Sequence, residues 1–360
     1  MPRVVGIDPG TVTLDICGLD TGKVFLDRTM PTVDALRNPQ TLARVIEQAA
    51  PLDLVAGPSG YGLPLMSARD ANDDDLRLAC LAPEGTAGGI GGLRAVMRLL
   101  GRLPVPVVFT PGVIHLPSVP DHRKVNRVDM GTADKLCAVV LAMRQETARR
   151  QCGPEDVSFV LLELGGAFTA AIAVDGGRVV DGIGGTSGPL GARASGALDG
   201  EVAFLMRSVE KDALFLGGAA SVAGVEPQAW PPEPPATPRA HRAWDAYVEQ
   251  AAKAVAALWV SAPGARLVLL SGRHGTAVVR EALIAALSPM RADIDVRLLG
   301  GVATMSKHAA QGAALMADGL AGGATAPVVE RLGLAAASGT VLDYLSVMTP
   351  EAARRRLGIS

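Results

Sequence analysis

The sequence predicts a mixed α/β protein built from two similar domains, and three observations support this. The chain has 360 residues, 49% of them hydrophobic, which is enough for two cores. Residues 4–28 read as a strand, a glycine turn, a second strand and a third strand. The same order restarts at residues 158–181. We therefore expect an N-terminal domain over 1–150, a C-terminal domain over 151–335 and a helical segment over 336–360.

The first glycine turn is the most informative short segment. An apolar strand at 4–7 ends in Asp8-Pro9-Gly10-Thr11, and Thr13 follows. A chain that turns here presents backbone N–H groups and hydroxyls to one place, beside the carboxylate of Asp8. Such a turn suits nucleotide phosphates and hydrated Mg²⁺. The alternative is that Asp8 only caps its own turn through an Asx hydrogen bond.

The second half of the chain begins with an equivalent turn. An apolar strand at 158–162 ends in Glu163-Leu164-Gly165-Gly166. Gly10, Gly165 and Gly166 would let the backbone approach phosphates closely. Glu163 is either a carboxylate that orients water on Mg²⁺ or a buried structural acid. The two turns predict two domains that face each other across a nucleotide cleft, whose closure would exclude water.

Helices and strands alternate between and after the two turns. A proline-rich segment at 227–238 is expected to be a surface loop, because it holds six prolines in twelve residues. The apolar periodicity predicts helices at 41–50, 91–101, 132–150, 241–260 and 306–320, and strands at 53–56, 105–109 and 266–270.

Composition excludes several classes of function. The net charge of −2 gives no basic surplus for nucleic acid, and no apolar stretch reads as a membrane span. The four cysteines are scattered without metal-ligand spacing, which favours free thiols in a reducing compartment. The N-terminus has no signal-peptide pattern. We expect a cytoplasmic protein that acts on a small molecule and that is compatible with a homodimer.

These motifs, taken in order, resemble the superfamily of sugar kinases, Hsp70 and actin, which includes the acetate and butyrate kinases. The resemblance implies a two-domain actin-like ATPase fold (ribonuclease H-like) with an interdomain nucleotide cleft. It also implies ATP and Mg²⁺ as cofactors, with the metal near Asp8 and Glu163. The helix around 309–314 resembles the segment that connects the two domains. The residues implied to bind the nucleotide are Asp8, Gly10, Thr11, Thr13, Gly165, Gly166, Ser271, Gly272 and Arg273.

Within the superfamily, the chain looks most like an uncharacterised family of predicted butyrate kinases. Residues 188–196 resemble the glycine-rich stretch of the carboxylate kinases, which implies that Arg193 stabilises the transferring phosphoryl group. By the same resemblance, His115 would hydrogen-bond that group and Asp134 would act as a base toward a hydroxyl substrate. The alternatives are a surface arginine, a histidine that satisfies loop backbone, and a first-turn helix acid.

The resemblance implies an ATP-dependent phosphotransferase, with a small carboxylate as the leading acceptor. The sequence also departs from acetate kinases, since it has Thr110-Pro111 in place of an aspartate and Met130 and Asp134 in place of two histidines. Lys307 is the nearest match to a glutamate associated with Mg²⁺. Two other readings stay open, which are an ATP-hydrolysing activator of the Hsp70 type and an ATP-dependent ligase that uses an acyl phosphate.

Overall fold

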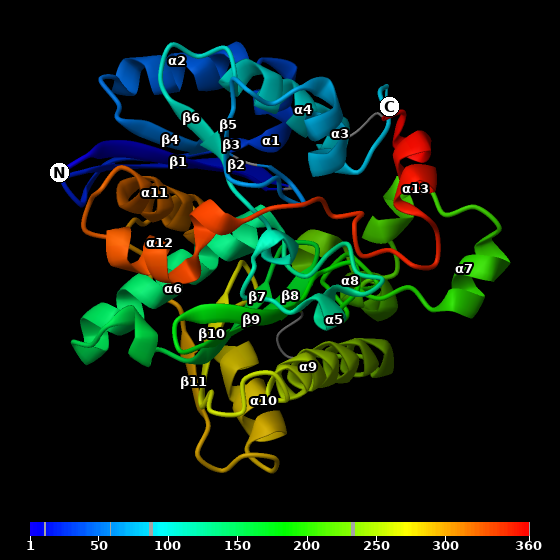
Figure 1. Ribbon diagram of the computed structural model, residues 1–360. Helices are drawn as coiled ribbons and strands as arrows, with labels where there is room; N and C mark the ends of the chain where they lie inside the picture. The colour runs from blue at the N-terminus through cyan, green and yellow to red at the C-terminus, as the bar shows by residue number, and fades with distance from the viewer. Residues whose placement is uncertain (11, 58, 86–88, 232–234, 360) are drawn as a thin grey trace. The chain divides into compact units, whose positions relative to one another are not determined.

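The computed structural model describes residues 1–10, 12–57, 59–85, 89–231 and 235–359. It has the predicted mixed α/β architecture, with two sheets (Figure 1). The chain forms two compact units, each described below by itself. The first unit contains residues 1–157, 176–179 and 300–360, and the second contains 158–175 and 180–299. This packing division differs from the sequence-based boundaries in placing 300–335 with the first unit.

The first unit is built on a six-stranded sheet in the order β3-β2-β1-β4-β6-β5. Strand β1 pairs antiparallel with β2 and parallel with β4. The predicted strand at 105–109 is shorter than expected, because Pro104 and Pro106 have no N–H to donate to a neighbour. The strands are β1 (Arg3–Pro9), β2 (Thr13–Asp20), β3 (Lys23–Pro31), β4 (Leu54–Gly57), β5 (Met66–Ser67) and β6 (Val107–Phe109).

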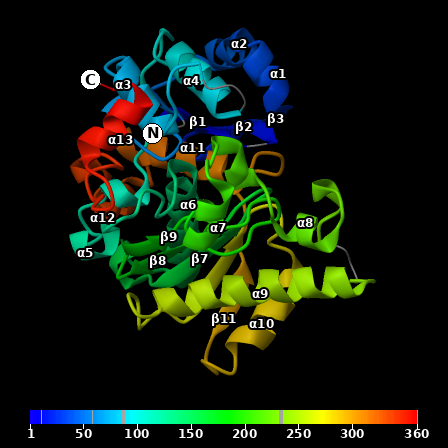
Figure 2. The same cartoon turned by 90° about the vertical axis from the view of Figure 1, so that its right-hand side faces the viewer.

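Helices cover both faces of this sheet. Helix α11 packs against β1, β2 and β4 on one face and against α6. Helices α2 and α4 lie on the opposite face (Figures 1 and 2). The helices of this unit are α1 (Thr32–Arg37), α2 (Gln40–Ala49), α3 (Asp73–Cys80), α4 (Gly89–Leu100), α5 (Asp121–Lys124), α6 (Ala133–Arg150), α11 (His308–Leu320), α12 (Ala326–Leu332) and α13 (Pro350–Leu357).

Glycines let α11 come unusually close to its neighbours. A Cβ atom at Gly6 on β1 would lie 2.1 Å from the backbone nitrogen of Ala314. A Cβ atom at Gly312 would lie 1.8 Å from the carbonyl oxygen of Cys137 on α6. Neither backbone atom can rotate away, so β1, α11 and α6 are held together by backbone-to-backbone packing.

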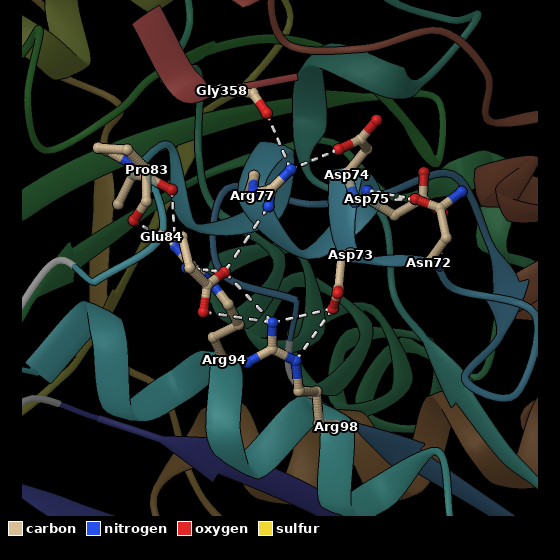
Figure 3. Close-up of polar contacts among 11 residues, drawn as sticks. Asn72, Asp73, Asp74, Asp75, Arg77, Pro83, Glu84, Arg94, Arg98 and Gly358 are labelled. Atoms are coloured by element: carbon tan, nitrogen blue, oxygen red, sulfur yellow. Dashed lines mark hydrogen bonds and ion pairs between the residues drawn. The ribbon is translucent and has the colours of Figure 1, made fainter. Parts of the chain in front are cut away.

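A charged network joins α3 and α4 to the end of the chain (Figure 3). The buried guanidinium of Arg94 donates to the carbonyl of Ala82 at 2.6 Å and pairs with Glu84 at 3.1 Å. Arg77 donates to the carbonyl of Gly358, just after α13, at 2.9 Å. Because these carbonyls follow helices or lie in loops, the arginines satisfy groups that secondary structure leaves unpaired.

The second unit contains a five-stranded sheet in the order β11-β10-β7-β8-β9. Strand β7 pairs antiparallel with β8 and parallel with β10. The first unit pairs β1 with β2 and β4 in the same way, so the repeat expected from the sequence is confirmed. The strands are β7 (Phe159–Leu164), β8 (Thr169–Asp175), β9 (Arg178–Ile183), β10 (Leu267–Ser271) and β11 (Asp295–Leu298).

Long helices cover one face of the second sheet. Helix α9 packs against β7, β8, α8 and α10. It begins at Pro238, earlier than expected, because Thr237 caps it by accepting the N–H of Ala240. Residues 227–229 form a short 3₁₀ turn within the predicted loop, part of which lies outside the described residues. The helices are α7 (Gly200–Met206), α8 (Ala219–Ala223), α9 (Pro238–Leu258) and α10 (Ala277–Leu287).

The close approach of α11 to α6 yields the first prediction. We expect Gly312→Ala to lower the free energy of unfolding by about 3 kcal/mol or more, because the added methyl group meets backbone. Gly200→Ala is the matched control, since a Cβ atom there meets nothing within 4 Å. Urea denaturation measures both variants. A Gly312→Ala protein as stable as the control would show that α11 and α6 do not pack this closely.

Candidate functional site

The first glycine turn ends strand β1 and places a lysine beside two aspartates. Asp8 and Asp15 are both buried, with 5% and 1% of their surface exposed. The ammonium of Lys307 lies 2.6 Å from Asp15 Oδ2 and 3.7 Å from Asp8 Oδ2. It also donates to the carbonyl oxygen of Thr13 at 2.8 Å. Thr11, predicted to face a phosphate, lies outside the described residues.

Asp15 has several close partners, whereas among the described residues Asp8 has only the longer contact with Lys307. The hydroxyls of Thr13 and Thr29 donate to Asp15 at 2.8 and 2.6 Å, in addition to the ammonium. Burial raises the pKa of Asp8 to about 7, and the charge of Lys307 only partly opposes this. Burial also acts to lower the pKa of Lys307, but the two carboxylates outweigh it and the pKa is raised. The ammonium is therefore a fixed positive charge at this turn.

The start of α6 brings a third carboxylate into the same region. Asp134 pairs with Lys135 at 2.6 Å and accepts the hydroxyl of Thr132. Burial opposes ionisation of Asp134, but Lys135 and Thr132 outweigh it, so its pKa is lowered. Its charge also contributes to the raised pKa of Asp8. The structure therefore brings the predicted residues Asp8 and Asp134 together, along with Lys307.

His115 ends the short 3₁₀ turn at Val113–His115 and is 2% exposed. Its Nδ1 lies 3.3 Å from the carbonyl oxygen of Gly112, and burial lowers the pKa of the imidazole to about 4. The ring is therefore neutral at pH 7 and donates from Nδ1 to loop backbone. A role toward a transferring phosphoryl group stays a prediction.

The second glycine turn lies beside the segment predicted to bind adenosine. Glu163, at the end of β7, is the register partner of Ser271, at the end of β10. Gly272 has φ of +88°, and a Cβ atom there would lie 2.5 Å from the carbonyl oxygen of Leu164. Gly165 donates to the carbonyl of Phe168 at 2.9 Å. Thus Gly165, Glu163 and the 271–273 segment gather at one edge of the second sheet.

The backbone of Arg193 is anchored to the same glycine turn. Its N–H donates to the carbonyl of Ala167 at 3.0 Å, and its own carbonyl accepts the N–H of Gly218 at 3.0 Å. A Cβ atom at Gly218 would lie 2.2 Å from the carbonyl carbon of Arg193. Arg193 is half-buried rather than a fully exposed surface arginine. The second unit therefore assembles Arg193 with the predicted phosphate turn.

The contact of Lys307 with the first turn is not revealed by the sequence, although Lys307 matches the position of a glutamate associated with Mg²⁺ in acetate kinases. It lies almost three hundred positions after Asp8, and its sequence neighbours carry no phosphate motif. The available signal was its position just before the small-residue helix, which resembles a connecting segment of the superfamily. Only the packing of α11 on β1 brings it to the first turn.

Comparisons with known proteins give a family but no curated relative. A family model described as a protein of unknown function (DUF1464) matches residues 6–347. No curated protein matches the chain significantly. No helix among the described residues has the length and apolar character that a membrane crossing requires.

The solved structures with a similar fold include acetate and propionate kinases. A propionate kinase from Francisella tularensis has a TM-score of 0.61 at 13% identity, over 87% of this chain and 99% of its own. Acetate kinase from Entamoeba histolytica has a TM-score of 0.58 at 13% identity, over 80% of this chain and 87% of its own. Acetate kinase from Porphyromonas gingivalis has a TM-score of 0.57 at 15% identity, over 81% of this chain and 88% of its own. The predicted two-domain actin-like ATPase fold is thereby confirmed.

The buried imidazole of His115 predicts a loss of stability in acid. In the unfolded chain the imidazole of His115 binds a proton below about pH 6.5, whereas in the folded protein its pKa is about 4 and it stays neutral down to that pH. Stability is therefore lost as the pH falls through this window, by about 2 kcal/mol between pH 7 and 4.5 from this residue. We expect the free energy of unfolding of His115→Gln to fall by about 2 kcal/mol less than that of the wild type over the same pH range. Urea denaturation at each pH measures the difference.

The exposed His241 on α9 provides the control for this measurement. His241→Gln should lose as much stability as the wild type on acidification. An unchanged acid profile in His115→Gln would mean that the imidazole is accessible to protons in the folded protein.

Proposed function

We propose that this chain, which belongs to the family of proteins of unknown function DUF1464, is an ATP-dependent phosphotransferase that acts on a small carboxylate. The observation that carries the proposal is the pair of glycine turns on equivalent strands of two sheets. The first turn offers Asp8 and Lys307, and the second lies beside Ser271. Acetate and propionate kinases with the same fold provide the reaction class.

Each turn would bind part of the nucleotide. Gly10 at the first turn and Gly166 at the second would present backbone N–H groups to phosphate oxygens. Gly165, whose N–H donates to Phe168, would only let the backbone approach the phosphate closely. Ser271, Gly272 and Arg273 would contact the adenosine, since they line the edge of the second sheet. Arg193 would stabilise the equatorial oxygens of the transferring phosphoryl group through its guanidinium fork.

The residues present fit a hydrated Mg²⁺ better than a fully protein-bound metal. No group of three or more His, Cys, Asp or Glu gathers into a metal site in the described ranges. Mg²⁺ on a nucleotide needs only one or two carboxylates, because it keeps several waters. Asp8 suits this role, because a nearby cation would favour its ionised form, and Glu163 is the second candidate. The metal would supply neutralisation of phosphate charge.

The state of Asp134 favours a carboxylate acceptor over a hydroxyl compound. A hydroxyl acceptor needs a base, and a base needs a pKa near the working pH. Both oxygens of Asp134 are bonded, to Lys135 and Thr132, and its pKa is lowered. A carboxylate acceptor is already ionised and needs no base. Asp134 would then hold Lys135 in place. The neutral imidazole of His115 has one N–H, which it gives to the carbonyl of Gly112, so its Nε2 would act as a hydrogen-bond acceptor.

Release of ADP in the presence of a panel of small carboxylates and hydroxy compounds tests this proposal. We expect one carboxylate to stimulate release and no hydroxy compound to do so. Slow turnover that no compound stimulates would instead support an ATP-hydrolysing activator. The nucleotide proposal would be overturned if the protein neither bound ATP nor turned it over, and if Asp8→Ala behaved like the wild type.

Gly166 allows a test of the second turn without disturbing the fold. A Cβ atom there meets nothing within 4 Å, so Gly166→Ala should leave stability unchanged. Because the added methyl group would stand between backbone and phosphate, we expect ATP to bind about tenfold more weakly. Calorimetric titration measures the change, with Gly200→Ala as the control. Unchanged affinity for ATP in Gly166→Ala would place the phosphates elsewhere.

A further inference from the structure

The segment that precedes α11, residues 300–307, is held rigidly against the first sheet, and we call it the lysine loop. Asp27 on β3 accepts the N–H groups of three successive residues of this loop. The donors and distances are Thr304 at 2.9 Å, Met305 at 2.8 Å and Ser306 at 2.7 Å. A carboxylate that accepts three backbone donors fixes the path of the chain immediately before Lys307.

A buried glutamine fixes the other side of the lysine loop. The side-chain oxygen of Gln311 on α11 accepts the N–H of Val302 at 2.6 Å, and its amide donates to the carbonyl of Ser306 at 2.6 Å. Gln145 on α6 donates to the carbonyl of Gly300 at 2.7 Å. The loop is therefore pinned at its start, middle and end. Such an amount of local bonding exceeds what an ordinary surface connection requires.

The pinned loop delivers one ammonium group to the first glycine turn. Lys307 has three N–H donors, and its contacts with Asp15 and Thr13 use two of them. A Cβ atom at Gly10 would lie only 2.3 Å from the Lys307 nitrogen, so the ammonium occupies the space that a side chain at this position would fill. The side chain of Lys307 is 42% exposed, whereas that of Asp15 is 1% exposed. The ammonium thus contacts buried carboxylates, and part of the Lys307 side chain is exposed.

We propose that Lys307 binds the phosphates of the nucleotide at the first glycine turn, as a cation that the protein itself supplies there. This proposal rests on the proposed function and adds a phosphate-binding residue to it. Lys307 bonds to Asp15 and to the carbonyl of Thr13, and its nitrogen lies against Gly10, at the turn where a phosphate would bind. Asp15 and the lysine loop position its charge before the ligand arrives, which avoids the cost of ordering a long side chain on binding.

Comparison of three ligands isolates the phosphate contact. ATP, ADP and adenosine are titrated by calorimetry against the wild type, Lys307→Met and Lys307→Arg. We expect Lys307→Met to bind ATP at least about tenfold more weakly, with a smaller loss for ADP and no change for adenosine. Lys307→Arg should retain most of the affinity for ATP. Lys253→Met is the control, because Lys253 is an exposed lysine on α9.

Two further measurements guard against a folding defect. Removal of the ammonium leaves Asp15 buried without a cation, so the double variant Asp15→Asn with Lys307→Met restores the charge balance. It should fold and show the same selective loss for ATP. In the wild-type protein, ATP should protect Lys307 from acylation by an amine-reactive reagent, read by mass spectrometry, and adenosine should not.

The outcomes separate this proposal from the one on which it rests. A wild-type protein that binds neither ATP nor adenosine overturns the proposed function. A wild-type protein that binds ATP, in which ATP leaves Lys307 open to acylation and the lysine variants bind ATP normally, overturns only the role of Lys307. An equal loss of affinity for ATP and adenosine would also contradict it. Adenosine has no phosphate, so the loss of a phosphate contact cannot weaken its binding.

Discussion

The first unit depends on how closely α11 approaches β1 and α6. Gly6 and Gly312 provide no Cβ atoms, so the contacts are between backbones at distances that any side chain would prevent. This packing fixes the start of α11 relative to the end of β1. The end of β1 carries Asp8 and the residue before α11 is Lys307. A contact made only of small residues therefore sets the geometry of the charged groups.

The charges at this place are paired unequally. Buried charges are costly unless they are paired and hydrogen-bonded. Asp15 and Asp134 satisfy this condition through short contacts with lysines and hydroxyls. The ammonium of Lys307 lies farther from Asp8, at 3.7 Å. The pKa of Asp8 is raised to about 7. Asp8 is consequently the carboxylate of this group that a bound cation would stabilise most.

The repeated strand pairing supports the proposed nucleotide site more directly than it supports the proposed acceptor site. Both sheets use a strand that ends at a glycine turn, returns antiparallel and has a parallel neighbour on its other side. This repeat generates two backbone surfaces of the kind that suits phosphates. The residues proposed to act toward the acceptor, Asp134, His115 and Arg193, lie outside the repeated strands. Their chemistry therefore has to be argued from their own contacts.

The sequence by itself determined the strands, the glycine turns and their duplication, because alternation of apolar residues and turn chemistry are local properties. It identified Asp8 and Gly165 as members of candidate sites for the same reason, whereas Asp134 was identified through the resemblance to carboxylate kinases. It did not determine that Lys307 contacts the first turn or that Asp27 fixes the loop before it. Those facts join residues far apart in the chain. Only the tertiary structure decided them, because they follow from the packing of one small-residue helix against a strand.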